Sequence, residues 1–242
     1  FSISLDTLQQ VQCYGECNGE VLLTVNSGGV SPYTFVWSTG QYYFGPGVDA
    51  ALNLCQGGYQ VIIADAYGCD TTISFTIVEP PILYPHANVI QPVQCFGFDD
   101  GIAYAIPVGG AATDASDYTY SWSPISNAND TIWNLPPGYH LVSVVDSNGC
   151  TAEDSILITE PTELVVNFTD SVYSYCLGTN SGELCAAASG GTLGYNYAWD
   201  GDNTNLAQTT PCVTNLHADI YTVTVIDARS CVATNVIDLD SI

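Results

Sequence analysis

Hydrophobic and polar residues alternate with a period of two along most of the chain. One such run passes through Tyr221, Val223 and Val225, and similar runs are separated at short intervals by glycine, proline and Asn-Gly pairs. A period of two is typical of strands that bury one face, and no run of the sequence has the 3.6-residue period of an amphipathic helix. We therefore expect an all-β fold.

Three sequence markers recur at steps of 81 or 82 residues. They are a Gly-Gly pair, an Asp-x-x-x-Cys turn and a Cys-x-Gly entry, which begin at Gly28, Gly109 and Gly190, at Asp65, Asp146 and Asp227, and at Cys13, Cys95 and Cys176. Repetition at this length predicts tandem small domains, here residues 1–81, 82–162 and 163–242. About six or seven short strands in each unit predict tandem immunoglobulin-like β-sandwich domains, stapled by disulfides.

One tryptophan follows each Gly-Gly pair by a few residues, namely Trp37, Trp122 and Trp199. An immunoglobulin-like fold places a tryptophan of strand C in the core at this point, so we interpret all three as core residues.

The aspartate that opens each Asp-x-x-x-Cys turn is expected to form an Asx turn. In the second unit, Gly138-Tyr139 precedes Asp146 by one residue more than Gly58-Tyr59 precedes Asp65. This offset predicts a β-bulge in that unit.

The charge is strongly one-sided: 25 acidic residues stand against one arginine, Arg229, and no lysine, for a net charge of −24. Such a chain lacks the cationic surface that nucleic acids or anionic lipids require. No apolar run is long enough to span a membrane. Because the sequence opens on Phe1 without a basic leader, we expect a mature or internal piece of a longer protein.

Ten cysteines with only three histidines indicate disulfides and an oxidising, extracellular location. The second unit holds two cysteines, which predicts Cys95–Cys150 and, by repetition, Cys13–Cys69 and Cys176–Cys231. Subtraction then leaves the pairs Cys17–Cys55 and Cys185–Cys212. A staggered scheme, Cys13–Cys150 with Cys95–Cys231, stays open as the second choice, because Cys95 and Cys150 can lie at opposite ends of a plain immunoglobulin-like sandwich.

The combined motifs resemble the SprB-type repeat of bacterial cell-surface adhesins. The resemblance rests on Cys-Phe-Gly-x-x-Asp-Gly (95–101), Gly-Gly-x-x-Pro-Tyr-x-x-x-Trp (28–37) and Leu-Pro-Pro-Gly-Tyr (135–139), followed by Asp-Ser-Asn-Gly-Cys (146–150) and Ile-Thr-Glu-Pro (158–161). The third unit departs most, since Ala-Arg-Ser-Cys stands at 228–231 in place of a Gly-Cys turn. The family implies an extracellular stalk or adhesive fibre of gliding Bacteroidetes, exported by the type IX secretion system.

The resemblance also implies O-glycosylation, because that phylum modifies Asp-Ser/Thr followed by a small or aliphatic residue. The candidate acceptors are Thr7, Thr71, Thr131, Ser155, Ser171 and Ser241.

The oxygen-rich segment with Asp200, Asp202 and Asn205 is a candidate calcium loop, against the alternative of a solvated polar loop. We expect no other cofactor. The three histidines occupy unrelated repeat positions and no catalytic constellation recurs, so we expect no enzymatic activity.

These features predict a structural or adhesive segment of an extracellular adhesin or filament, involved in surface adhesion and gliding. Its expected partners are other repeats of the same long chain, neighbouring filament chains or surface glycans. Two alternatives stay open. The first is a self-assembling fibre or sheath subunit that docks through Tyr42-Tyr43-Phe44, and the second is a carbohydrate-binding module that stacks sugars on Tyr42, Tyr43 and Trp133.

Overall fold

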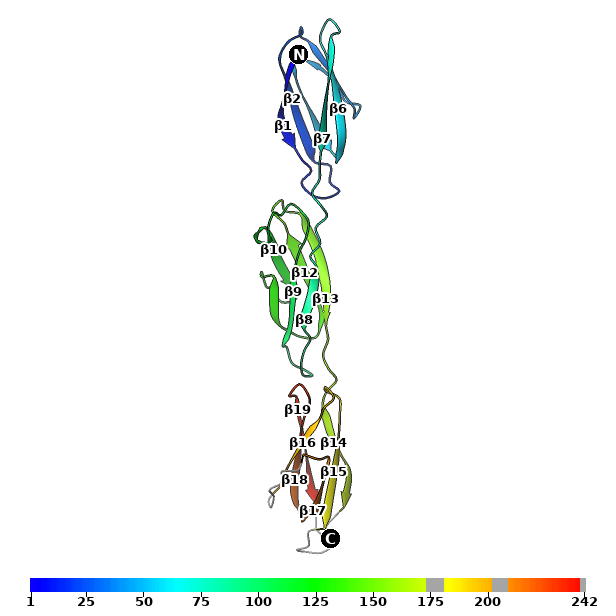
Figure 1. Ribbon diagram of the computed structural model, residues 1–242, viewed down its shortest axis with the longest axis vertical. Coiled ribbons are helices and arrows are strands. Elements are labelled where there is room, and N and C mark those ends of the chain that lie inside the picture. Colours follow the sequence, from blue (N-terminus) through cyan, green and yellow to red (C-terminus); the bar gives the residue numbers. More distant parts are fainter. Residues whose placement is uncertain (173–180, 202–208, 240–242) are drawn as a thin grey trace. The chain divides into compact units, whose positions relative to one another are not determined.

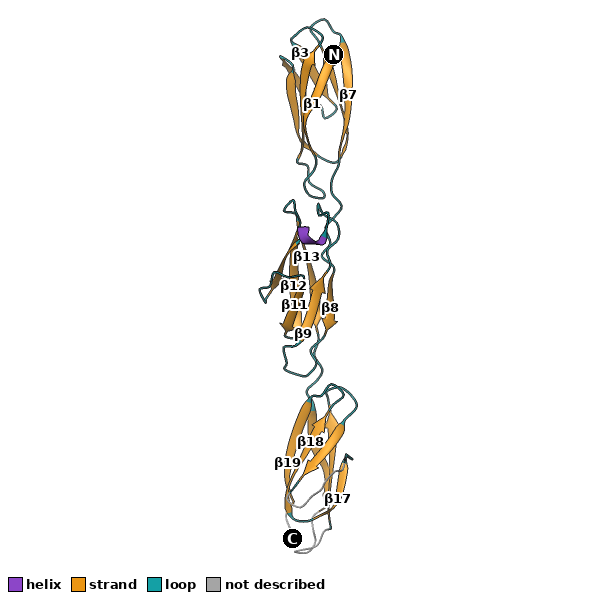
Figure 2. Cartoon of the chain, turned by 60° about the vertical axis from the view of Figure 1, so that its left-hand side comes forward, coloured by secondary structure: helices purple, strands orange, loops and turns teal. Residues whose placement is uncertain are grey.

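The computed structural model describes residues 1–172, 181–201 and 209–239. Within these ranges the chain consists of β-strands and connecting loops, with one short 3₁₀ turn at Ala115–Asp117 (Figure 2). Every strand pairing with a defined register is antiparallel. The expected all-β fold is confirmed.

The first stretch of the chain, residues 1–77, forms two sheets (Figure 1). The three-stranded sheet has the order β1 (Ser2–Gln9), β2 (Gly19–Ser27), β5 (Val48–Leu54). The four-stranded sheet has the order β4 (Tyr42–Gly45), β3 (Tyr33–Trp37), β6 (Gly57–Ala64), β7 (Asp70–Ile77).

The second stretch, residues 87–158, also forms two sheets, each of three strands. One has the order β11 (Thr131–Leu135), β9 (Gly101–Ala105), β8 (Ala87–Gln91). The other has the order β10 (Thr119–Ser123), β12 (Gly138–Val145), β13 (Thr151–Ile158).

The third stretch, residues 165–239, repeats this pattern. Its sheets have the orders β14 (Val165–Val172), β15 (Gly182–Ser189), β17 (Cys212–Leu216) and β16 (Asn196–Asp200), β18 (Asp219–Ile226), β19 (Val232–Leu239). In all three stretches the first two strands share a sheet with the strand that precedes the last hairpin. This is the strand order of an immunoglobulin-like sandwich, and the first stretch has β4 as an additional edge strand.

The chain divides into two compact units that do not follow these stretches. One comprises residues 1–87, 105–130 and 141–154, and the other comprises residues 88–104, 131–140 and 155–242. Strands β12 and β13 therefore contribute to both units. The domain boundaries expected from the repeat, after residues 81 and 162, stay predictions.

Alternating side chains build the cores of the first and third stretches. Val21 and Leu23 of β2 lie in one buried cluster with Phe35, Val61 and other residues of the facing sheet. In the third stretch, the run predicted from Tyr221, Val223 and Val225 is completely buried. The period of two is therefore the signature of a sheet with one face in the core.

The three tryptophans are core residues, as expected. Trp37, Trp122 and Trp199 are only 3%, 2% and 5% exposed and lie in β3, β10 and β16, the third strand of each stretch. Each indole N–H donates a hydrogen bond, to Asp49 Oδ2 and to the carbonyl oxygens of Asn129 and Thr210. The polar atom of each ring is thus satisfied inside the core.

The β-bulge predicted between Gly138-Tyr139 and Asp146 is absent from the pairing of β12 with β10. Strand β12 is as long as β6, and its pairing with β10 runs without a register shift. His140, and not Tyr139, occupies the position of Tyr59: both side chains bond the carbonyl oxygen four residues earlier, of Pro136 and Cys55 respectively. The sequence offset arose because the conspicuous Gly-Tyr pair is shifted by one residue in this stretch.

Candidate functional site

The Asp-x-x-x-Cys turns are built identically three times. In each turn one carboxylate oxygen of the aspartate accepts the backbone N–H groups of the residues two and four positions later; for Asp146 these are Asn148 and Cys150, both at 2.9 Å. The expected Asx turn is confirmed. The aspartates are nearly buried, at 8%, 6% and 3% exposure for Asp65, Asp146 and Asp227.

The second carboxylate oxygen reaches the Gly-Gly loop, which the sequence did not predict. Oδ2 of Asp65, Asp146 and Asp227 accepts the N–H of the residue after the Gly-Gly pair, at 3.1, 2.8 and 2.7 Å. One carboxylate therefore ties two loops that are 35 residues apart in the chain.

The Gly-Gly pair is required by this contact. A Cβ on Gly110 would lie 2.4 Å from Asp146 Oδ2, and a Cβ on Gly191 would lie 2.6 Å from Asp227 Oδ2. Both glycines also have positive φ, at 68° and 57°. Only glycine combines this backbone conformation with so close an approach.

Burial and hydrogen bonds act in opposite directions on these carboxyls. For Asp65 and Asp227, desolvation raises the pKa, but the backbone hydrogen bonds of the turn and of the Gly-Gly loop together outweigh it and hold the pKa below its ordinary value. Arg229 adds a favourable charge interaction that lowers the pKa of Asp227 further. These two aspartates are therefore charged anchors at neutral pH.

The disulfides follow the staggered scheme. Cys13 is bonded to Cys150 and Cys95 to Cys231, so the predicted pairs Cys13–Cys69, Cys95–Cys150 and Cys176–Cys231 are wrong. Cys69 is free and exposed, and Cys176 lies outside the described residues.

The reason is the length of the last strand in each stretch. Val11 donates to Val78 just beyond the end of β7, which places the Cys13 loop at that end, whereas Cys69 immediately precedes the start of β7. The strand has eight residues and spans about 26 Å at roughly 3.3 Å per residue. A disulfide needs Cα atoms within about 7 Å, so Cys13 and Cys69 cannot meet.

Each staggered bridge is supported by further polar contacts. Beside the Cys13–Cys150 bridge, Asn148 Nδ2 donates to the carbonyl oxygen of Gln12 at 2.9 Å, and Cys150 Sγ lies 3.3 Å from the same oxygen. Beside the other bridge, Arg229 Nη1 donates to the carbonyl oxygen of Val93 at 3.4 Å.

The Cys-x-Gly loop is held by a glutamate that follows the last strand of its stretch. Glu79 Oε2 accepts the N–H of Gly15 at 2.8 Å, and Glu160 Oε2 accepts the N–H of Gly97 at 2.9 Å. The glutamates of Glu79-Pro80 and Glu160-Pro161 therefore hold the loops that carry Cys13 and Cys95, respectively.

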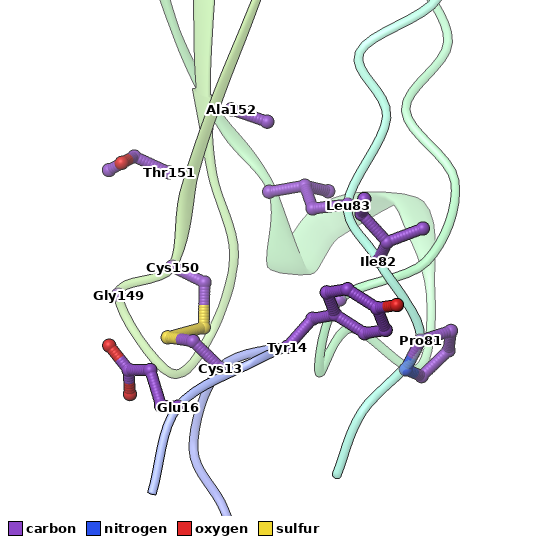
Figure 3. A pocket seen from close by; sticks show the side chains of 11 residues that line it. Cys13, Tyr14, Glu16, Pro81, Ile82, Leu83, Gly149, Cys150, Thr151 and Ala152 are labelled. Atoms are coloured by element: carbon purple, nitrogen blue, oxygen red, sulfur yellow. A yellow bond between two sulfur atoms is a disulfide. The ribbon is translucent and has the colours of Figure 1, made fainter.

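An open pocket of about 450 Å³ lies beside the Cys13–Cys150 bridge (Figure 3). Figure 3 shows the Tyr14 ring directed toward Ile82 on one side of the bridge, with the Glu16 carboxylate on the other side. A pocket of about 300 Å³ lies beside the Cys95–Cys231 bridge and is lined by Phe96 and Phe98 of the equivalent loop. We call each set of turn, loop and bridge a junction.

The other two disulfides are those predicted by subtraction. Cys17 is bonded to Cys55. Cys185 is bonded to Cys212, and these two residues are direct partners in the β15–β17 pairing.

The candidate calcium loop is only partly described. Asp200 ends β16 and is exposed, while Asp202 and Asn205 lie outside the described residues. Among the described residues, the one group of acidic, histidine or cysteine side chains close enough to share a metal is Glu183, Cys185 and Cys212, whose cysteines are bonded to each other. Calcium binding stays a prediction.

The candidate glycosylation sites are dispersed over the strands. Thr71, Thr131, Ser155 and Ser171 lie in β7, β11, β13 and β14; Ser155 is exposed and the other three are half-buried. Thr7 lies in β1, and Ser241 is outside the described residues.

The aromatic residues proposed for sugar stacking do not form one platform on β4. Tyr42 and Tyr43 are neighbours in that strand, so their side chains point to opposite faces. Tyr42 is 66% exposed, whereas the Tyr43 ring contacts Phe35, with ring centroids 6.2 Å apart. Trp133 is exposed on β11.

One segment of the chain matches a known family model. It contains the Cys13 loop, the first Gly-Gly pair and Trp37. Residues 5–42 match the family model described as the SprB repeat. The resemblance derived from the motifs is confirmed for this segment, and the presence of three such repeats stays a prediction. No curated protein matches the chain at a significant level.

Several solved structures are similar to this chain. The C-terminal fragment of intimin, solved with the intimin-binding domain of its translocated receptor, is 14% identical over 69% of this chain and 66% of that chain, with a TM-score of 0.33. The N-terminal eight immunoglobulin domains of Down syndrome cell adhesion molecule are 13% identical over 96% of this chain, with a TM-score of 0.35. Domains 4–9 of the surface layer protein SbsC are 12% identical over all of this chain, with a TM-score of 0.28.

The chain spans 34% of the adhesion-molecule fragment and 47% of the surface-layer fragment. TM-scores in this range do not establish a shared function. In the described ranges no helix is long and apolar enough to cross a membrane. The disulfides fit an extracellular protein.

Proposed function

We propose that this chain is a structural segment of an extracellular surface adhesin whose SprB-type repeats are joined twice at each junction, by peptide and by disulfide. The observation that carries the proposal is the pair of staggered bridges, which close sequence separations of 137 and 136 residues. A bridge confined to one sandwich stabilises that sandwich alone. A staggered bridge adds a second covalent path between consecutive sandwiches.

A second path suits a protein that carries mechanical load. The segment Val78–His86 between β7 and β8 is otherwise the single covalent connection between the strands of the first and second stretches. With Cys13–Cys150 in place, cleavage of this segment leaves the two stretches covalently joined. A surface protein exposed to proteases and shear would stay in one piece after such a cleavage because of this second covalent connection.

The test is a protease site inserted between Pro80 and Pro81, in an otherwise unaltered chain. After complete cleavage, the account predicts one band on a non-reducing gel and two bands after reduction. The result arises because residues 1–80 keep Cys13 and the remainder keeps Cys150.

The matched control carries Cys150→Ser in addition to the inserted site. Without the bridge, cleavage must release two fragments even before reduction. If the unaltered cysteines also gave two fragments without reduction, the bypass would not exist and the load-bearing proposal would fail.

The finer role rests on the family resemblance: adhesion during gliding, export by the type IX system and O-glycosylation. In a gliding bacterium that carries this gene, Cys13→Ser with Cys95→Ser should reduce surface attachment under flow and colony spreading. Normal attachment and spreading, with the variant present at wild-type amounts on the cell surface, would exclude a mechanical role for the junctions in gliding.

Edge strand β4 supports self-assembly as a second candidate function. It pairs with β3 on one side only, and it exposes 66% of Tyr42 and 59% of Phe44. Exposed aromatic side chains on an unprotected edge are a route to strand pairing between chains. Filaments formed by the purified chain and abolished by Tyr42→Lys with Phe44→Lys would support this function; a monomer at high concentration would exclude it.

A further inference from the structure

The three Asp-x-x-x-Cys turns differ in whether a loop of another stretch is bonded to their cysteine. Cys150 and Cys231 are 9% and 8% exposed, and each is bonded to the cysteine of a Cys-x-Gly loop from the preceding stretch. Cys69 holds the same position in the first stretch, and it is exposed and free.

The uncovered turn already has the conformation of the two covered turns. Asp65 Oδ1 accepts Tyr67 and Cys69 N–H groups at 2.9 Å, and Asp65 N donates to the carbonyl oxygen of Cys69 at 2.9 Å. The corresponding distances at Asp146 are 2.9, 2.9 and 3.0 Å. The turn that presents Cys69 therefore needs no rearrangement to form a junction.

Two further residues near Cys69 hold positions that contact the docked loop in the other two stretches. Asn148 and Arg229, the third residues of their turns, donate to backbone carbonyls of the docked loop. Tyr67 holds that position in the first turn and is 81% exposed. Val30, which follows the first Gly-Gly pair, is 46% exposed, whereas its counterparts Ala111 and Thr192 are half-buried.

We propose that the face formed by Val30, Tyr67 and Cys69 is a docking site for the Cys-x-Gly loop of a further SprB-type repeat on its N-terminal side. The cysteine of that loop would form a disulfide with Cys69. This bond does not depend on the function proposed for the chain. The partner is a loop braced by a Glu-Pro carboxylate, as Glu79 braces Gly15.

The bond forms from two thiols by thiol–disulfide exchange with a small-molecule disulfide such as oxidised glutathione. One S–S bond is made and one is broken. The small disulfide takes up the two electrons and two protons and leaves as two thiols.

The test is a longer chain in which a copy of residues 82–162 precedes Phe1. Disulfide mapping should show Cys95 of the added copy bonded to Cys69, and the freely alkylated thiol should move from Cys69 to Cys150 of the added copy. The bridges Cys13–Cys150 and Cys95–Cys231 of the original chain, mapped in the same sample, report that it has folded. A second extension with a copy of residues 1–81, which supplies Cys13 instead, should give the same result.

Two matched controls separate docking from mere proximity. With Cys95→Ser in the added copy, Cys69 must remain alkylated. With Cys95→Ser and Phe96→Cys, the thiol is moved by one residue, and cross-linking should fall at least tenfold. The proposal is overturned if Cys69 stays free in both unaltered extensions, or if the displaced cysteine cross-links equally well.

Discussion

One aspartate carboxylate organises each turn at the residue scale. Its two oxygens together accept three or more backbone N–H groups from two loops, and the side chain is shielded from water. Because these bonds join the Gly-Gly loop to the turn, the carboxylate fixes both the turn and the position of the cysteine that ends it. The disulfide is thus placed by hydrogen bonds as well as by chain connectivity.

Asp227→Asn tests this role. In asparagine an NH₂ group replaces one carboxylate oxygen. This NH₂ group would face a backbone N–H, of Thr192 or of the turn, so at least one buried hydrogen bond is lost. We expect the free energy of unfolding to fall by about 1–3 kcal/mol at neutral pH. Urea unfolding measures the loss, with Asp238→Asn, at an exposed position of β19, as the matched control.

The effect should depend on pH in a defined direction. Since the pKa of Asp227 in the folded protein lies below its ordinary value, its contribution is fully present above the unfolded pKa of about 3.9 and is lost as pH falls through the lower folded pKa. The stability gap between wild type and Asp227→Asn should therefore narrow from pH 7 to pH 3. A gap of the same size at pH 3 would contradict the charged-anchor role.

Residue patterns predicted local geometry but not long-range partners. The Asx turns and the buried tryptophans follow from short motifs, because the atoms involved lie within a few residues of each other. The same spacing argument missed Asn53, Asn134 and Asn215, which recur every 81 residues with φ near 60°. Their Asn-Leu repetition was visible in the sequence. Each asparagine is the next-to-last residue of β5, β11 or β17 and lies at a shift in the register of that strand's pairing.

At the element scale, the Cys185–Cys212 bridge fastens β17 to β15. The bonded residues are direct pairing partners, so the bridge fixes the register of a short five-residue strand. It closes a separation of 27 residues, which corresponds to about 3–4 kcal/mol in the chain-entropy model.

Replacing both cysteines by alanine should therefore loosen this sheet selectively. Amide hydrogen exchange in β15 and β17 is expected to accelerate at least a hundredfold, because about 1.4 kcal/mol corresponds to a tenfold change. Peptides from β1 and β2, whose stretch keeps Cys17–Cys55, serve as the internal control. Uniform acceleration in both stretches, or none in either, would show that the bridge does not act on this sheet.

Alternation alone did not decide which face of a strand is buried. In β9 the larger side chains Ile102 and Tyr104 are half-buried, while Gly101, Ala103 and Ala105 point into the core. The small residues are required there, since a Cβ on Gly101 would lie 2.8 Å from the carbonyl oxygen of Leu135. The periodicity of a strand is readable from sequence, but its orientation depends on the space that its neighbours leave.

At the scale of the whole molecule, the account depends on covalent connectivity. The repeat spacing revealed equivalent cysteines, and the assumption that each repeat closes its own bridge then paired them wrongly. The eight-residue length of the last strand separates the two cysteines of one repeat and brings each to the edge that meets the next. The length of the last strand, more than the number of cysteines, determines which cysteines pair.

Non-reducing disulfide mapping of the 242-residue chain tests this central claim most directly. Trypsin is of little use, because Arg229 is its one cleavage site in a chain without lysine, so chymotrypsin and a glutamate-specific protease are needed. The account predicts linked peptides for Cys13–Cys150 and Cys95–Cys231, with Cys69 alkylated before reduction. Linked peptides for Cys13–Cys69 and Cys95–Cys150 would contradict it, since each repeat would then be closed on itself.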